Sequence, residues 1–516
     1  MRNLDSNLTA PCEEKSPHWG YIAAALLLAL LLRLYRISSQ SIWVDEMLTL
    51  HASGITFPLH LIDIFDNVHG ALHSVVLFLW TRIAGTSEFA LRLPSAVFSV
   101  LSIFAIYRLL LKLVGRETAL VALTILVISP FHIWYGQEVR NYSMLIFFST
   151  LSVDSFLSLL QEPGKGTFAK YVLFTFAAFL SNMSTTFLLI VENILFFLLP
   201  RKLSFRNLVF ANVFIALLLI PWIWGMIGRV EFHRLVRTAP YLESEMLRGE
   251  TTFTPLAIPY TFYNFSIGYT LGPSLRELHE SVGFSAFRHY LPVLLAAALG
   301  FSVASVAGIV SLRKRRRLLL ALLLWILVPA VFVSFFAIKN FKPFNPRYVM
   351  VAFPAYLALV AEGVRRIKPL FIRPILAVLI AATMGLSLWN YYQVPRHGKE
   401  DFRSAANKLK ADFHPDDIVF AEGTFEPLIY YCGSGFPLSP IYPEVMSDQK
   451  RLMGLIEERT AGKKRIWLVT SRLWTCDPDR RIETLFRELF VLKEESFFEG
   501  IQLFLFEKKL LVAEAT

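Results

Sequence analysis

Long apolar stretches separated by short polar segments dominate the chain. A helix that crosses a bilayer needs about 20 residues at a rise of about 1.5 Å each. Runs of nearly that size cover residues 18–37, 94–113, 118–135, 142–160, 207–227, 290–312, 318–338, 349–362 and 370–389. The longer stretch 168–200 divides into a helical hairpin if it turns near Ser181, Asn182 and Thr185. The pattern predicts a polytopic membrane domain of about eleven spans.

One apolar run, residues 71–84, is too short to cross comfortably and contains His73 and Arg82. We expect it to form a helix in the outer leaflet. The basic clusters then all fall on the cytoplasmic side; they are residues 108–116, 165–170, 201–202, 313–317 and 365–368. This places the N-terminus in the cytoplasm and the C-terminus outside. Arg33 and Arg36, at the outer end of the first span, go against the rule.

The outer face then carries the chemistry. Its segments are residues 38–93, 136–141, 228–289 and 339–348, together with the C-terminal tail. From residue 390 the composition becomes mixed, with helical patterns at 401–411 and 480–490 and strand patterns at 417–421, 465–469 and 491–507. The fold class is therefore mainly α: a membrane domain at 1–389 and a small extracytoplasmic α/β domain at 390–516.

Composition supports this fold and excludes one class of partner. The chain is 55% hydrophobic, with a mean hydropathy of +0.51 and a net charge of +11. Because the basic residues cluster between apolar runs, they indicate cytoplasmic loops and no nucleic-acid surface. Three cysteines exclude a disulfide framework. A Cys432–Cys476 disulfide and two free thiols both remain open.

An acidic pair, Asp45 and Glu46, follows the first span in an apolar and aromatic neighbourhood. A carboxylate at this place can take a proton from an attacking hydroxyl or help to hold a divalent cation. The alternative is a solvated pair in a loop.

Two further outer segments carry charge next to the hydrocarbon. Residues 135–142 contain Gln137, Glu138 and Arg140, and charges there are costly unless they are paired or functional. Arg140 can bind a phosphate, or a Glu138–Arg140 pair can simply anchor two helix ends. Residues 339–348 carry three basic residues, although loops on the outer face are usually poor in positive charge. This charge indicates an anionic ligand at Arg347. The alternative is that the basic side chains contact lipid phosphates.

A histidine pair gives a weaker signal. His69 and His73 are spaced to share a helix face and could ligate a metal, but without a third ligand the pattern favours polar groups at an interface. A divalent metal therefore stays open.

Taken together, four stretches resemble the GT-C glycosyltransferases, in the bacterial branch related to protein O-mannosyltransferases, aminoarabinose transferases and lipid-linked galacturonosyltransferases. They are residues 43–46, 87–95, 135–142 and 346–348 with Pro354. The resemblance implies that Asp45 is the catalytic carboxylate beside Glu46, and that Arg140 and Arg347 face the carrier phosphate. The supporting residues it implies are Gln137, Glu138, Tyr142, Tyr348 and His69.

One departure concerns His69-Gly70-Ala71-Leu72, where many relatives have His-Pro-Pro-Leu, and it puts the acceptor side and any metal role of His69 in doubt. The resemblance implies transfer of a sugar from a polyprenyl-phosphate carrier to a lipid, glycan or protein acceptor at the outer face of the bacterial inner membrane. A transporter or flippase of lipid-linked sugars, and a noncatalytic scaffold, are the rival hypotheses.

Overall fold

The structure is a computed structural model in which most of the chain is described. The described residues are 19–55, 70–227, 255–274, 277, 283–339, 344–423, 425–433, 435–446 and 448–509. Parts of the expected outer loops 38–93 and 228–289 lie outside this set, as do His69 and Cys12. Side chains of 225–227, 283–286, 443–444 and 475–476 are also outside it.

The membrane domain is a bundle of helices whose bounds follow the apolar runs closely. The helices are α1 (Trp19–Leu34), α2 (Val44–Ala52), α4 (Ala71–Ala84), α5 (Glu88–Leu113), α6 (Arg116–Val127), α7 (Pro130–Gly136), α8 (Tyr142–Gln161), α9 (Lys165–Ser181), α10 (Thr185–Leu198), α11 (Phe205–Ile227), α12 (Ala257–Ile267), η3 (Gly283–Tyr290), α14 (Leu291–Leu312), α15 (Arg316–Ile338), η4 (Pro346–Ala352), α16 (Phe353–Arg366) and α17 (Ile372–Gln393). The expected hairpin is present, since α9 ends and α10 begins around Asn182.

The helices confirm an integral membrane protein. Among the described residues, seven helices are long and apolar enough to cross a bilayer, and the bent pair α6–α7 would make an eighth. Helices α1, α4 and α10 are apolar but shorter. The total of eleven spans and the orientation of the termini stay predictions.

The contacts of Arg33 explain why a basic residue lies at the end of the first span that is expected to face outward. Its side chain is fully buried between helices and donates to the carbonyls of Leu126 and Val127 at 3.2 Å each. These carbonyls belong to the end of α6, just before the 58° bend into α7. The guanidinium therefore satisfies backbone groups that a helix end leaves unpaired, and it faces His132 of α7 at 2.8 Å.

Helices α14 and α16 approach each other closely through two glycines. A Cβ atom at Gly308 would lie 2.0 Å from the carbonyl oxygen of Leu359, and one at Gly363 would lie 1.7 Å from that of Ala304. Only glycine fits at such a distance, as in other close pairs of membrane helices.

The C-terminal residues form a five-stranded sheet in the order β2-β1-β3-β5-β4. Strands β1 (Ile418–Glu422), β2 (Leu438–Ile441) and β3 (Arg465–Ser471) are parallel, whereas β4 (Phe490–Phe498) and β5 (Ile501–Lys508) are antiparallel. The helices of this domain are α18 (Phe402–Asp412), α19 (Glu426–Cys432), α20 (Pro443–Met446), α21 (Gln449–Thr460), α22 (Leu473–Cys476) and α23 (Arg481–Leu489), preceded by η5 (Pro395–His397). Cys432 is a free thiol in the described structure.

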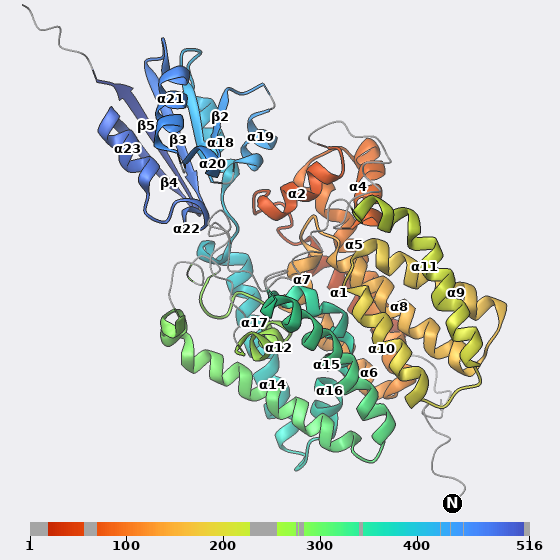
Figure 1. Ribbon diagram of the computed structural model, residues 1–516. Coiled ribbons are helices and arrows are strands. Elements are labelled where there is room, and N and C mark those ends of the chain that lie inside the picture. Colours follow the sequence, from red (N-terminus) through yellow and green to blue (C-terminus); the bar gives the residue numbers. More distant parts are fainter. Residues whose placement is uncertain are drawn as a thin grey trace, which may run out of the picture.

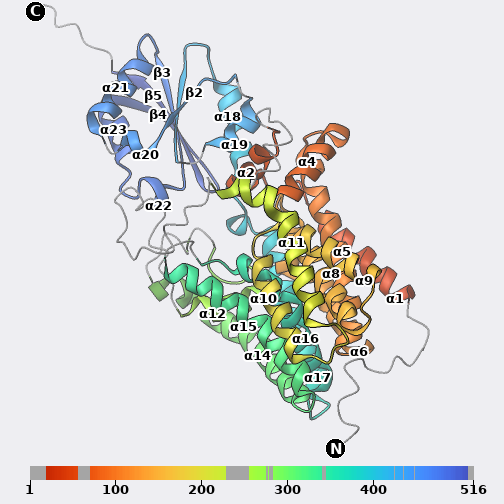
Figure 2. The same ribbon diagram turned by 45° about the vertical axis from the view of Figure 1, so that its right-hand side comes forward.

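The α/β domain lies at one end of the helix bundle, beside α2 (Figures 1 and 2). Its helix α19 packs against α2, which follows the first span. The segment expected to carry the catalytic acid is therefore enclosed between the bundle and the α/β domain.

Candidate active site

Asp45 lies in the first turn of α2 and forms an ion pair with Arg347 of η4. The two residues are far apart in the chain, and Arg347 Nη1 donates to Asp45 Oδ2 at 2.5 Å. Both side chains keep a small exposed fraction, 17% for Asp45 and 21% for Arg347. Burial by itself would raise the pKa of Asp45, but Arg347 and Arg140 lower it to about 2. The carboxylate is therefore ionised at neutral pH.

Arg140 contacts the same helix, α2, through the backbone of Asp45 and the side chain of Thr49. Its Nη1 donates to the backbone carbonyl of Asp45 at 2.7 Å and to Thr49 Oγ1 at 3.1 Å. The guanidinium carbons of Arg140 and Arg347 lie 5.6 and 5.8 Å from the ring centre of Tyr142. Tyr142 thus holds the two cations near each other, and the Tyr348 ring lies 5.4 Å from Arg347.

Two donors in this group are left over. Among the described residues, the buried Nε atoms of Arg140 and Arg347 have no hydrogen-bond partner. An unpartnered buried donor is costly, and a guanidinium is well shaped for phosphate oxygens. The site is therefore suited to an anionic ligand next to Asp45.

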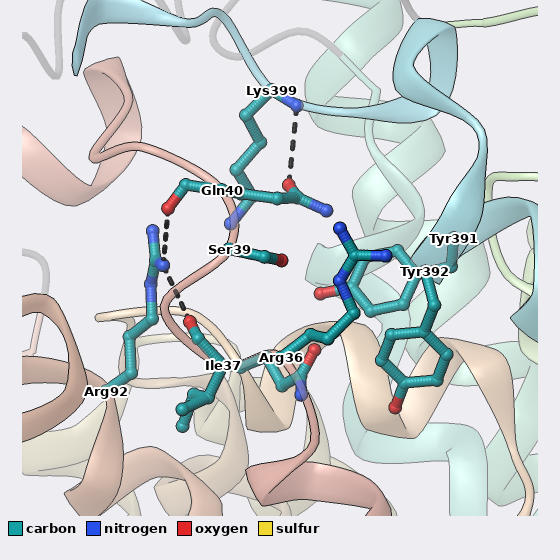
Figure 3. A pocket seen from close by; sticks show the side chains of 9 residues that line it. Arg36, Ile37, Ser39, Gln40, Arg92, Tyr391, Tyr392 and Lys399 are labelled. Atoms are coloured by element: carbon teal, nitrogen blue, oxygen red, sulfur yellow. Dashed lines mark hydrogen bonds between the residues drawn. The ribbon is translucent and has the colours of Figure 1, made fainter. Parts of the chain in front are cut away.

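Glu46, the neighbour of Asp45, accepts hydrogen bonds at both of its carboxylate oxygens. It is fully buried, and Arg92 donates to its two oxygens at 2.8 and 2.6 Å. The Val139 N–H donates to it as well, at 2.9 Å. Arg92 also donates to the carbonyls of the segment before α2, at Ile37 and Gln40 (Figure 3). Glu46 and Arg92 together fix the start of α2.

Glu138 pairs with a lysine from the far end of the chain. Lys399 Nζ lies 3.2 Å from Glu138 Oε1 and 3.9 Å from Glu46 Oε1, and all three side chains are at most 2% exposed. The ammonium also lies 5.1 Å from the Trp43 ring centre and 5.6 Å from that of Trp134. Burial raises the pKa of Glu138 and Lys399 opposes that shift.

The other residues singled out in the sequence are Gln137, His73 and His69. Gln137 donates to the carbonyls of Arg33 and Tyr35 at 2.8 Å each and so closes the end of α1. His73 is buried, with its Nε2 at 3.5 Å from Ser95 Oγ. His69 lies outside the described residues, so its proposed roles stay untested.

A divalent metal has no ready ligand set here. Within the described ranges, no three His, Cys, Asp or Glu side chains are placed to hold a metal ion. The acids that would be candidates are each already neutralised: Asp45 by Arg347, Glu46 by Arg92 and Glu138 by Lys399. These residues do not fit a divalent cation in the observed arrangement.

Sequence reasoning missed two cations of the site. Arg92 stands in the stretch 87–95 but received no role, and Lys399 stood beyond the last span. A usable signal was present for Arg92, because a charge in the first turns of an apolar helix is costly without a partner. No local pattern marks Lys399, whose partners come from distant segments.

The helical bundle and the C-terminal α/β domain together form a membrane protein with the GT-C fold. A family model for dolichyl-phosphate-mannose-protein mannosyltransferases matches residues 68–224. No curated protein sequence matches the chain.

Solved structures agree with this fold. The chain is similar to ArnT from Cupriavidus metallidurans in the apo state, with a TM-score of 0.58, 12% identity and coverage of 95% of this chain and 98% of that one. The same enzyme bound to undecaprenyl phosphate matches with a TM-score of 0.55, 12% identity and the same coverage. The archaeal oligosaccharyltransferase AglB from Archaeoglobus fulgidus, in complex with an inhibitory peptide and a dolichol-phosphate, matches with a TM-score of 0.53 and 11% identity over 94% of this chain and 74% of that one.

Proposed function

We propose that the protein is a glycosyltransferase of the bacterial inner membrane that takes a sugar from a polyprenyl-phosphate carrier and transfers it to a lipid, glycan or protein acceptor on the extracytoplasmic face. The observation that carries the proposal is the position of Asp45, whose carboxylate pairs with Arg347 and whose backbone carbonyl accepts a hydrogen bond from Arg140. Both cations have an unpartnered buried donor. Support comes also from the likeness to ArnT, a structure of which contains undecaprenyl phosphate.

In the proposed reaction, a hydroxyl of the acceptor attacks the anomeric carbon of the donor sugar. Asp45 accepts the hydroxyl proton while the bond from the sugar to the carrier phosphate breaks. The polyprenyl phosphate leaves with the electron pair, and the configuration at the anomeric carbon is inverted. Arg347 and Arg140 stabilise the negative charge that develops on the phosphate.

The observed pair also suggests an order of events. In the structure, Arg347 donates a hydrogen bond to the Asp45 carboxylate, which is the base in the proposed reaction. A donor phosphate competes with Asp45 for this guanidinium, so donor binding frees the carboxylate to accept a proton. Glu46 and Glu138 hold α2 and the loop before α8 in place, because their oxygens are bound to Arg92 and Lys399.

The test is transfer of radiolabelled sugar from polyprenyl-phosphate donors to a membrane acceptor extract. Asp45→Asn keeps the volume of the side chain and is expected to abolish transfer. Asp154→Asn is the matched control, because Asp154 forms an ion pair of the same length, 2.5 Å, with Lys112 on the bundle. Full transfer by the Asp45 variant at equal expression would remove this carboxylate from the mechanism.

A further inference from the structure

The α/β domain is attached to the catalytic side of the bundle by polar contacts. Arg403 pairs with Glu88 and donates to the carbonyl of Ser38 at 2.8 Å. The Ile42 N–H donates to the Tyr431 hydroxyl at 2.6 Å, three residues before Asp45. These contacts join the domain to the segment before α2 and to the start of α5, so the domain has a fixed position relative to the proposed base.

The sheet of the α/β domain is oriented with one edge toward the membrane domain. Strands β1 and β3 are parallel, and their carboxyl ends lie toward the membrane domain: β1 leads toward α19, which packs on α2, and β3 leads to Arg472. In open sheets with parallel strands, ligands bind beyond the carboxyl ends of the strands. This edge of the sheet is thus the one that faces the site.

Arg472, directly after β3, reaches that site. Its Nε donates to Glu400 at 2.5 Å, and its guanidinium carbon lies 5.5 Å from the ring centre of Trp43, two residues before Asp45. Its positive charge is near enough to contribute to the ionisation of Asp45. The residue has a left-handed backbone, with φ at 49°, which costs energy for a side chain other than glycine.

We propose that Arg472 is a third anion-binding guanidinium of the site, supplied by the α/β domain, and that it binds the phosphate of the lipid-linked donor together with Arg347 and Arg140. The proposal rests on the proposed function. A phosphate monoester that leaves the sugar carries up to two negative charges, and Arg347 must also serve Asp45. A further cation from the α/β domain adds to the positive charge that receives this phosphate, and the polar contacts of the domain hold that cation beside α2.

The chain contains a matched control for Arg472. Arg480 also has a left-handed backbone, with φ at 52°, and also precedes a short helix of the same domain, α23. It pairs with Glu483 at 3.2 Å inside the domain. Asparagine tolerates this backbone region, so Arg472→Asn and Arg480→Asn carry the same change in backbone preference.

The first measurement is steady-state transfer with the full-length protein in lipid. Arg472→Asn is expected to raise the KM for the donor by roughly tenfold or more, as for a lost charge-assisted hydrogen bond, and to leave the KM for the acceptor unchanged. Arg472→Lys should recover part of the loss, and Arg480→Asn should behave as the wild type. A donor KM for Arg472→Asn equal to that of the wild type would overturn the proposal, whatever happens to the acceptor.

A second measurement separates this proposal from the reaction itself. Binding of undecaprenyl phosphate to the purified protein needs no turnover. A Kd that rises at least tenfold in Arg472→Asn, and not in Arg480→Asn, supports the phosphate site even if the wild type transfers no sugar. Equal Kd values in all three proteins would refute it even if transfer is normal.

Discussion

Replacing Lys399 by methionine tests whether the α/β domain holds the acids of the site in place. The substitution keeps the length of the side chain but removes the cation that faces Glu138 at 3.2 Å and Glu46 at 3.9 Å. Glu46 keeps Arg92 as its partner, so the uncompensated charge is mainly that of Glu138. Breaking a buried ion pair on one side costs about 3–5 kcal/mol. We expect a loss of unfolding free energy of this size at pH 8.

The loss of unfolding free energy in Lys399→Met should depend on pH, and the environment of Glu138 defines the direction. The pKa of Glu138 is already raised by burial, and without Lys399 it must rise further. Between the ordinary pKa of 4.5 and that raised value, the folded variant binds more protons than the unfolded one. Its stability therefore falls as pH rises through this window, and the deficit relative to the wild type shrinks toward pH 5.

The measurement is thermal unfolding in detergent at pH 5 and pH 8, with two companion variants. Lys399→Met combined with Glu138→Gln should regain most of the loss, because no buried charge is left unpaired. Lys408→Met is the control, since Lys408 pairs with Asp412 and Glu494 on the surface of the same domain, and such pairs are worth about 1 kcal/mol or less. If Lys399→Met unfolds like Lys408→Met at both pH values, the argument from buried charge is wrong.

Two other predictions concern the base and the bundle. In Arg347→Gln the pKa of Asp45 should rise above about 2, because the effect of burial is then opposed mainly by Arg140. The acid limb of the pH profile of kcat/KM should therefore move to higher pH. An acid limb at the same pH as in the wild type would contradict the pairing of Asp45 with Arg347. In Gly308→Ala the new Cβ would lie 2.0 Å from the Leu359 carbonyl, so overpacking should cost about 1–3 kcal/mol or more in thermal unfolding. Gly385→Ala, which meets nothing within 4 Å, should be neutral or slightly stabilising, and equal losses in the two would exclude close packing as the cause.

The helices could be predicted from the sequence because each apolar run is a local signal. Residues 71–84, for example, were expected as a short helix, and α4 has these bounds. The α/β domain was expected with two strands and a strand pair, but β2 was missed. It has only four residues, Leu438–Ile441, and its partner β1 comes from another part of the chain. Such a strand has no alternating pattern long enough to recognise.

The candidate site was predictable only as separate pieces. The segments with Asp45, Arg140 and Arg347 stood out because charges next to apolar runs are rare. Their pairing was not predictable, since Asp45 and Arg347 meet only when η4 packs beside α8. The Glu138–Arg140 pair that a local reading offers is replaced by pairs with Lys399 and with the backbone of Asp45. Sequence neighbours on a short loop point to different sides, so tertiary contacts decide the partners.

The charges of the site imply that substrate binding is an exchange of partners. Each acid has one cation as its main partner: Arg347 for Asp45, Arg92 for Glu46 and Lys399 for Glu138. The latter two pairs are nearly inaccessible, whereas the Asp45–Arg347 pair keeps exposed surface on both sides. Of these three cations, only Arg347 is therefore accessible to an incoming anion. The other two pairs hold α2 and the loop before α8. The carboxylate released when an anion binds Arg347 therefore stays in place, which is what a positioned general base requires.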